Sequence, residues 1–115
     1  SGYDYVQPIL ELGAHVAPTG IAFYNNDFHF PEEFKNNLFI TLHGSWNRSA
    51  KVGYKVLRVV LNEAGEVTTA EDFITGWLQG EKVVGRPSAP FVMSDGSLLI
   101  SDDKANVIYR IAYKQ

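Results

Sequence analysis

The chain of 115 residues contains no cysteine. No disulfide framework can therefore hold the fold together, and no thiolate is available as a nucleophile or a metal ligand, while the redox compartment is left open. Positive charge is also scarce, because 10 lysines and arginines face 13 aspartates and glutamates and the net charge is −3. Without a basic stripe, neither nucleic acid nor an anionic membrane surface is an expected partner.

Long apolar runs are missing as well. No run approaches the roughly 18 residues that a membrane-spanning helix needs, and the N-terminus has no charged stretch followed by an apolar one. The compartment stays undetermined, because a leader can be removed from a mature chain. Sustained helical periodicity is absent too. Short β-prone runs separated by glycine, asparagine and proline take its place, so the sequence predicts an all-β fold.

Eight short strands are expected. A turn over residues 16–20 precedes the first group, and one helical turn begins at Pro31, since proline suits a first helical position. A strand near 5–13 contains Pro8, which an edge strand tolerates because proline lacks an N–H. The other seven strands are expected at 21–24, 38–42, 54–61, 67–78, 89–93, 98–102 and 107–113.

The two halves of the chain repeat one pattern in the same order. The echoes are Pro18 to Phe23 with Pro87 to Val92, Leu38 to Thr41 with Leu98 to Ser101, and Arg58-Val59 with Arg110-Ile111, at spacings of 69, 60 and 52 residues. Such a repeat of a four-stranded β unit is typical of propeller blades. We therefore expect one partial β-propeller domain over residues 1–115, about two four-stranded antiparallel blades that are part of, or assemble toward, a six-bladed ring.

The blade-like units are expected at about residues 14–80 and 84–115, with the strand at 5–13 belonging to a neighbouring or closing blade. Two blades cannot bury both of their faces. The chain is therefore either a part of a longer protein or a short protein whose copies associate, and a homo-oligomer is expected if it is complete.

A polar cluster follows the predicted strand at 38–42. Its side chains include hydrogen-bond donors, an indole ring and a fixed positive charge, contributed by His43, Ser45, Trp46, Asn47 and Arg48. A loop held between two strands is a common place for binding residues. Two interpretations stay open from composition alone, a binding site and a satisfied polar turn in which Trp46 covers the core.

Six phrases along the chain resemble the sorbosone dehydrogenase family, the soluble sugar dehydrogenases that use pyrroloquinoline quinone (PQQ) on a six-bladed β-propeller. The phrases are HVAPTGIAFY at 15–24, LFITLHGSWNRS at 38–49, GYKV at 53–56, DFITG at 72–76, GRP at 85–87 and DGSLLISDD with IYR at 95–110. The likeness covers about residues 8 to 113 and only the C-terminal part of a family member. It implies that the catalytic histidine base and most of the calcium ligands precede this region.

The resemblance places a basic residue at Arg48 and another arginine at Arg86 against the carboxylates of the quinone. Guanidinium forks suit a planar tricarboxylate, because arginine keeps its charge and binds bidentately. Trp46 would cover an aromatic ring or a sugar face. With Asn47 and His43 these residues form the predicted cofactor-binding set, and no catalytic residue and no metal ligand is predicted within the chain.

Two further groups have competing interpretations. His43 can act as a general base or ligand, but a histidine in a Gly-Ser turn more often hydrogen-bonds to backbone. Asp102 and Asp103 have the oxygen ligands that calcium prefers, but adjacent residues of a strand point to opposite sides and make a poor ligand pair. For the two aspartates we favour a blade turn in which one carboxylate accepts hydrogen bonds from backbone N–H groups.

Two functions of different classes follow. The first is a partial β-propeller related to PQQ-dependent sugar (sorbosone or aldose) dehydrogenases, with PQQ or sugar binding through the loop of Trp46 and Arg48. The second is a non-catalytic, self-assembling β-module that binds a ligand or a protein partner. The resemblance implies a periplasmic or secreted location, a sugar ligand, and calcium in the complete family fold.

Overall fold

The computed structural model describes residues 8–12, 16–25, 30–45 and 53–114. Its elements follow from the alternation of apolar and polar residues, interrupted by glycine and asparagine turns. They are β1 (Val16–Tyr24), the 3₁₀ turn η1 (Glu32–Phe34), β2 (Asn37–Ser45), β3 (Lys55–Leu61), β4 (Val67–Ile74), β5 (Leu78–Gln79), β6 (Lys82–Val83), β7 (Pro87–Val92), β8 (Leu98–Asp102) and β9 (Val107–Ile111).

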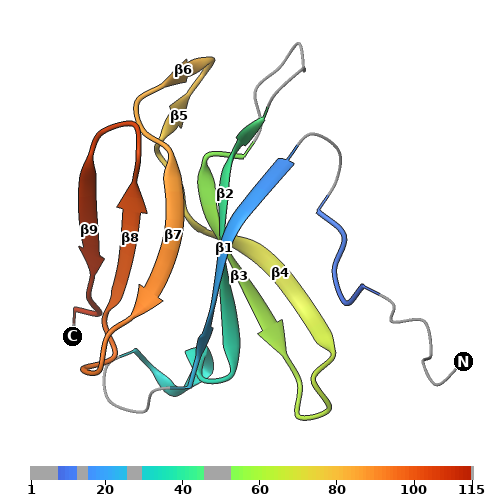
Figure 1. The fold of residues 1–115 in the computed structure, drawn as a ribbon. Helices are drawn as coiled ribbons and strands as arrows, with labels where there is room; N and C mark the ends of the chain where they lie inside the picture. The colour runs from blue at the N-terminus through green and yellow to red at the C-terminus, as the bar shows by residue number, and fades with distance from the viewer. Residues whose placement is uncertain (1–7, 13–15, 26–29, 46–52, 115) are drawn as a thin grey trace, which may run out of the picture.

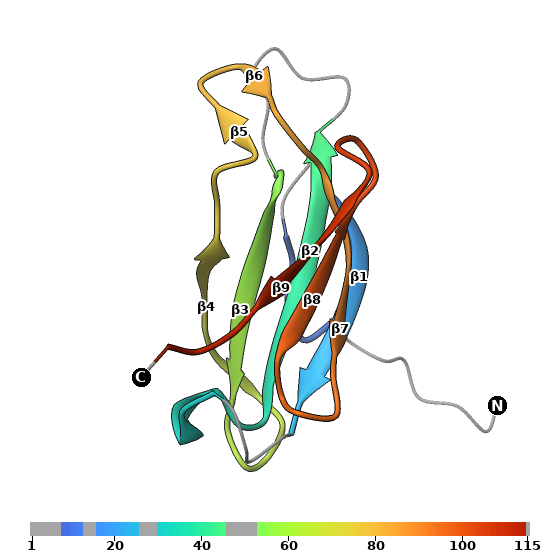
Figure 2. The same cartoon turned by 90° about the vertical axis from the view of Figure 1, so that its left-hand side faces the viewer.

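All strand pairs of the described residues are antiparallel. They form a four-stranded sheet in the order β1-β2-β3-β4, a three-stranded sheet in the order β7-β8-β9 and the small hairpin β5-β6 (Figure 1). Strand β7 lies against β1 and β2, so that the three-stranded sheet covers one face of the four-stranded sheet (Figure 2). The prediction of an all-β fold is confirmed, and no helix of the described residues is long and apolar enough to cross a bilayer.

The two sheets share the register that the sequence repeat predicts. Ala22 pairs with Phe39 in the first sheet, and the residues 69 and 60 positions later, Phe91 and Leu99, pair in the second. The same holds for β2-β3 and β8-β9 throughout their common length. Even the irregular step recurs, between Pro18 and Gly20 in β1 and between Pro87 and Ala89 in β7. The repeat is therefore structural at the level of single residues.

Three boundaries differ from the predictions. The expected turn at 16–20 is part of β1, where Pro18 sits on an edge strand that needs no N–H from it. The expected strand at 67–78 ends at Ile74, because Gly76 has a φ of 119°, and the hairpin β5-β6 follows. Residues 8–12 of the expected N-terminal strand pair with no strand of the described chain.

Residues 8–12 instead contribute side chains to an apolar cluster. Leu10 and Leu12 pack against the outer face of the four-stranded sheet, on buried residues that alternate along β2 and β3, namely Ile40, Leu42, Leu57 and Val59. Successive side chains of a strand point to opposite faces of the sheet. Alternate residues of β2 and β3 therefore face this cluster, and the residues between them face the other side of the sheet. The outer face of the first sheet is thus partly covered by the chain itself.

A second apolar cluster fills the space between the sheets. Phe39 and Val56 of the first sheet meet Leu98 and Ile100 of the second, all of them fully buried. Trp77 joins this cluster and is 7% exposed. The seam between the sheets, by which we mean this packed contact, is the main hydrophobic core of the chain.

Tyr24 adds a polar anchor to the seam. Its hydroxyl donates a hydrogen bond of 2.6 Å to the carbonyl oxygen of Gly96 and accepts one of 3.1 Å from the N–H of Phe30. Burial raises the pKa of the Tyr24 hydroxyl, although the bond from Phe30 acts in the opposite direction. The buried hydroxyl ties the hairpin turn of the second sheet to the loop before β2.

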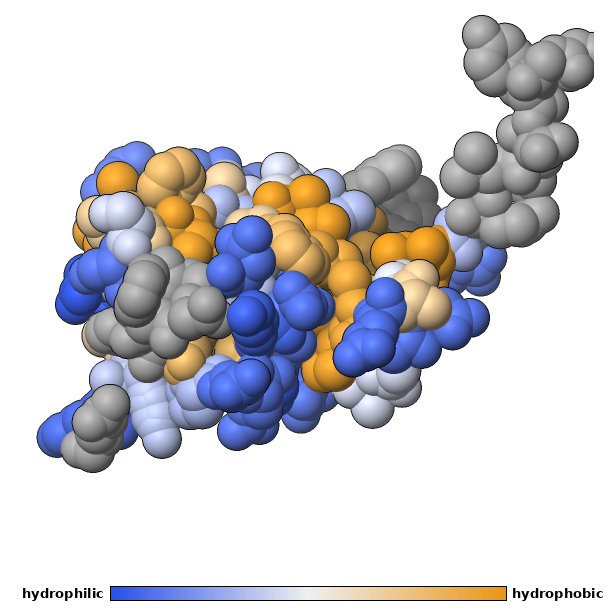
Figure 3. Space-filling model, turned by 90° about the horizontal axis from the view of Figure 1, so that it is seen from below, coloured by the Kyte–Doolittle hydropathy of each residue, from blue (hydrophilic) through white to orange (hydrophobic). Residues whose placement is uncertain are grey.

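Aromatic rings gather at the lower end of the seam. Phe30, Phe34, Phe39 and Phe73 pack with ring centroids 4.8 to 6.5 Å apart, and the view from below shows apolar surface between hydrophilic side chains (Figure 3). The guanidinium carbon of Arg58 lies 4.0 Å from the centre of the Phe34 ring. This end of the seam is therefore a cluster of four phenylalanine rings with one guanidinium against it.

Candidate functional site

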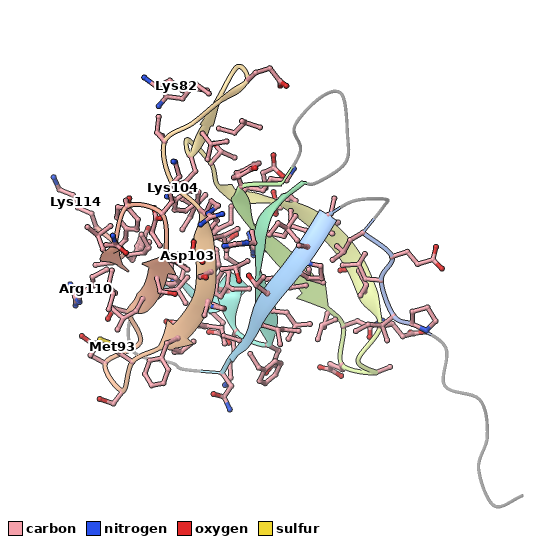
Figure 4. All side chains as sticks on the ribbon, turned by 45° about the horizontal axis from the view of Figure 1, so that its top comes forward. Lys82, Met93, Asp103, Lys104, Arg110 and Lys114 are labelled. Atoms are coloured by element: carbon pink, nitrogen blue, oxygen red, sulfur yellow. The ribbon has the colours of Figure 1, made fainter. Side chains whose placement is uncertain are left out.

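The candidate site lies at the edge where β2 and β8 both end and β7 begins, the upper edge in Figure 1. Because β2 and β8 are equivalent strands of two packed sheets, His43 near the end of β2 and Asp103 just after β8 come together. Figure 4 labels Asp103 at this junction. We call the described side chains that meet there, His43, Arg86, Ser88 and Asp103, the edge cluster.

Asp103 is the centre of the edge cluster. Its carboxylate oxygens lie 2.8 and 3.0 Å from Nε2 of His43, and its Oδ1 lies 3.2 Å from Nε of Arg86. The hydroxyl of Ser88 lies 3.4 Å from Oδ2. The contact with His43, followed by the charges of His43 and Arg86, lowers the pKa of Asp103 below its usual value although partial desolvation opposes the shift. Asp103 is therefore charged at neutral pH and links both sheets.

Asp102 has a different role from its neighbour. It is 2% exposed, and its Oδ1 accepts hydrogen bonds from the backbone N–H groups of Arg86, Lys104 and Ala105. Burial alone raises the pKa of Asp102, but these bonds and one from the hydroxyl of Tyr109 outweigh it and the pKa is lowered. This is the turn interpretation predicted for the pair, so Asp102 shapes the backbone and leaves Asp103 free to contact side chains.

Gly85 and Pro87, on either side of Arg86, are each required by the packing around them. A Cβ at Gly85 would overlap the Asp102 carboxylate and the Trp77 ring. Pro87 is fully buried and opens β7. Between them, the N–H of Arg86 is bonded to Asp102 and its carbonyl oxygen accepts a 3.3 Å bond from the N–H of Asp103. The backbone from which the Arg86 side chain leaves is therefore held on both sides.

The Arg86 side chain is 42% exposed, although its Nε is buried. That Nε has no aligned hydrogen-bond acceptor among the described residues and meets Asp103 only as an ion pair. A guanidinium presents five donors in a planar fork. An arginine whose inner nitrogen is held by charge and whose outer part reaches solvent fits an added anion, since bidentate carboxylates are its preferred ligands.

The structure brings two of the predicted cofactor-binding residues, His43 and Arg86, into one cluster. The predicted residues Trp46, Asn47 and Arg48 lie outside the described residues. Among the described residues the partner of His43 is the Asp103 carboxylate and not a backbone group. The sequence predicted neither Asp103 nor Ser88 as a site residue, although the 60-residue offset of the repeat maps His43 onto Asp103 and thus to one edge.

Both ends of the loop 46–52 meet in a close contact. A Cβ at Gly53 would lie 3.0 Å from the Cα of Gly44, and a Cβ at Gly44 would collide with the ring of Tyr54. Tyr54 is buried and has a φ of 56°, a left-handed conformation that is costly for a bulky residue. Two glycines and a strained tyrosine therefore fix the base of the loop that holds Trp46 and Arg48.

Several hollows lie along the described sheets. One of about 560 Å³ lies beside Asp103 and is lined by Ser88, Ser101, Asn106 and Ile108, among others. Another of about 360 Å³ lies at the aromatic end of the seam. Neither is lined by His43 or Arg86, and the described residues hold no group of three or more His, Cys, Asp or Glu side chains that could bind a metal.

Comparison with known proteins gives consistent results. The model of the TrAA12-like family matches residues 2–114. An uncharacterized protein of Borreliella burgdorferi is 44% identical over 115 residues, which is 96% of this chain and 30% of that protein. A pyrroloquinoline quinone-dependent pyranose dehydrogenase of Coprinopsis cinerea is 44% identical over 55 residues, 47% of this chain and 6% of that enzyme.

Solved structures agree with these matches. The calcium structure of a Trichoderma reesei carbohydrate-active enzyme of family AA12 aligns with 92% of this chain and 26% of its own, at 25% identity and a TM-score of 0.72. The holo form of the PQQ domain of pyranose dehydrogenase from Coprinopsis cinerea aligns with 94% of this chain and 29% of its own, at 27% identity and a TM-score of 0.66. The chain thus spans less than a third of each relative's length, and the expected relation to PQQ-dependent oxidoreductase domains is confirmed.

Proposed function

Because the chain belongs to the TrAA12-like family, we propose that it supplies part of the PQQ-binding face of a sugar-oxidising oxidoreductase, with sorbosone or another aldose as the substrate class. The observation that supports this proposal most directly is the edge cluster. There the exposed guanidinium of Arg86 and the ring of His43 stand at one end of the seam, beside the base of the loop that holds Arg48.

In this proposal the residues of the chain bind and orient the cofactor. Arg86 and Arg48 contact the carboxylates of PQQ, His43 adds a polar contact beside them, and Asn47 and Trp46 contact the polar rim and the ring face. Bound PQQ supplies the chemistry, since the quinone accepts the hydride equivalent of a sugar C–H bond. The buried Nε of Arg86, which lacks an aligned acceptor, agrees with a side chain that is held ready for an anion.

The proposal assigns no general base and no calcium ligand to the described residues. Asp102 is fully engaged with backbone N–H groups, and the described residues contain no acidic or histidine cluster of three. As the resemblance implies, most calcium ligands of the complete domain would come from blades that precede this region. Sugar oxidation is a proposal for the complete domain, because this chain spans under a third of its relatives.

The test is a titration of the full chain with PQQ, in which absorbance and calorimetry measure binding. Arg86→Ala and Arg48→Ala are each expected to weaken binding by about 1.5–3 kcal/mol, the usual contribution of a hydrogen bond to a charged group. Arg110→Ala is the matched control, because Arg110 lies on β9, pairs with Asp95 and is away from the edge cluster (Figure 4). Unchanged affinity in both site variants would reject the proposed binding role.

A second candidate is self-assembly, which the exposed apolar residues favour. Ile21 of β1 and Ile108 of β9 are 63% and 68% exposed, and they lie on sheet faces outside the seam. By the repeat, the outer face of the first sheet is equivalent to the seam face of the second sheet, as Ile40 corresponds to Ile100. The outer face of the second sheet is in turn equivalent to the seam face of the first. The outer face of the first sheet of one copy could therefore pack on the outer face of the second sheet of another copy, in the way the two sheets pack within the chain.

A further inference from the structure

We propose that Asp103 is a positioning residue, which holds Arg86 and His43 so that the outer fork of the Arg86 guanidinium faces an anionic ligand. The inference rests on the proposed function for the identity of that ligand, the carboxylate-bearing quinone. Its structural part concerns only the contacts of three side chains and can be tested without the ligand.

The first argument is the division of labour between the two aspartates. The turn after β8 is held by Asp102, whose Oδ1 accepts three backbone N–H groups. Asp103 contributes its own N–H to the carbonyl of Arg86, and this bond does not need its carboxylate. The Asp103 carboxylate is therefore not required to form the turn, and among the described residues it contacts the side chains of His43, Arg86 and Ser88.

The second argument is the geometry of the guanidinium. The ion pair joins Asp103 Oδ1 to Nε, the inner nitrogen of Arg86, at 3.2 Å. A carboxylate on that side leaves the two terminal nitrogens as a second fork for another carboxylate. The backbone of Arg86 is fixed by Asp102 and Asp103, so the ion pair selects the direction of a side chain whose origin is already set.

The third argument is that one carboxylate serves both sheets. His43 comes from β2 of the first sheet, whereas Arg86 precedes β7 of the second, and Asp103 contacts both. A carboxylate beside Nε2 of His43 favours an imidazole that carries a proton on that nitrogen. The same residue therefore sets the orientation of the two predicted cofactor contacts relative to each other.

The charge of Asp103 also repels a bound anion, and this effect has the opposite sign. Removal of a simple counter-charge would strengthen anion binding, by a factor that added salt screens. Removal of a positioning group would weaken it. The direction of the change in Asp103→Asn therefore separates the two roles.

The first measurement is the affinity of the full chain for PQQ at low and at moderate salt. Asp103→Asn is expected to raise the Kd roughly tenfold, as does loss of residues that orient a binding group, and Asp103→Glu is expected to recover part of it. In an Arg86→Ala background Asp103→Asn is expected to have little further effect, since coupled residues are not additive. Tighter or unchanged binding in Asp103→Asn would overturn the inference.

Asp95→Asn is the matched control. Asp95 bonds to Ser97 and pairs with Arg110 at 3.0 Å, so the substitution removes an equivalent charge and ion pair from the same sheet. It is expected to leave the affinity for PQQ unchanged. An equal loss of affinity in both variants would show a general effect on the sheet and would contradict a positioning role for Asp103.

The second measurement is independent of PQQ. In nitrogen-15 NMR spectra of the full chain, the Nε–H resonance of Arg86, identified by its absence in Arg86→Lys, is expected to be visible and to disappear or broaden in Asp103→Asn. If that dependence is found while no variant binds PQQ, the proposed function fails and the positioning role stands. A resonance that is the same with and without the Asp103 carboxylate would overturn the positioning role.

Discussion

His43 and Asp103 occupy equivalent positions of the two sheets, and Nε2 of His43 lies 2.8 Å from Oδ2 of Asp103. The repeat therefore places a basic ring at this position in one copy and an acid in the other, and the seam brings them into contact. Because the two side chains are 25% and 47% exposed, the pair adds little to stability. Its importance lies in where it holds the charges at the edge of the seam.

Acid is expected to destabilise the chain through its depressed carboxylates. Hydrogen bonds and nearby charges lower the pKa values of Asp95, Asp102 and Asp103 relative to the ordinary value of 3.8. Groups with a folded pKa below the unfolded one stabilise the fold fully above about pH 3.8 and lose that contribution as the pH falls toward the folded pKa. The midpoint temperature of thermal unfolding, measured between pH 6 and pH 2, is expected to decrease once the pH is below about 4.

Asp102→Asn is the variant that tests the source of this acid sensitivity. The amide cannot ionise, so the variant is expected to be less stable at neutral pH and to lose less of its stability on acidification. An unfolding midpoint of the native chain that is equal at pH 6 and pH 2.5 would contradict the assignment.

Tyr24→Phe is expected to lower the free energy of unfolding by about 1–3 kcal/mol, because it removes a buried hydroxyl that bonds to the Gly96 carbonyl and the Phe30 N–H. Urea unfolding measures the change. Tyr54→Phe is the control, since the Tyr54 hydroxyl has no recorded hydrogen bond to another described residue. Equal effects of the two substitutions would argue against the role of the Tyr24 hydroxyl.

Gly20→Ala is expected to wedge the seam open. The added Cβ would lie 2.6 Å from Cδ of Pro90 and 3.0 Å from Cα of Ala89. Overpacking of this kind typically reduces stability by about 1–3 kcal/mol. In the double variant with Pro90→Ala the nearest obstacle is gone, and calorimetric melting should show part of the loss restored. Additive losses would mean that the two residues do not compete for the same space.

Ile21→Asp tests the assembly proposal. A charge on this exposed apolar position would oppose burial of the outer face of β1, so any oligomer formed through that face is expected to dissociate. Light scattering of the full chain gives the native mass before and after the substitution. Ser94→Asp, on the exposed turn between β7 and β8, is a suitable comparison at a different surface. An assembly that persists in Ile21→Asp must use another face.

The pattern of the fold could be predicted from the sequence because repeats carry information about register. The offsets of 69, 60 and 52 residues fix which strands are equivalent, and the observed pairs, such as Ile21 with Ile40 and Pro90 with Ile100, follow them. The hairpin β5-β6 could not be predicted, since two-residue strands have no alternation to detect. Its position depends on Gly76 and Gly80, whose positive φ angles are not visible in composition.

The candidate site was harder to predict than the fold. The resemblance indicates Arg86 and the polar cluster after residues 38–42 indicates His43, but only the ends of β2 and β8 place the two at one edge. The sequence indicates only a calcium or turn residue at Asp103. Its contact with His43 depends on how one sheet packs on the other, which the sequence does not show. Sequence spacing within a strand gives alternation, but it does not give the rotation between sheets.

Packing at the seam explains a difference between two equivalent positions of the repeat, Gly20 and Ala89. Gly20 lies so close to β7 that there is no room for a methyl group. The residue 69 positions later, Ala89, is exposed and carries one. The two copies thus differ by a single carbon where one is enclosed and the other is open. A designer who exchanges the two hairpins must therefore exchange this carbon as well.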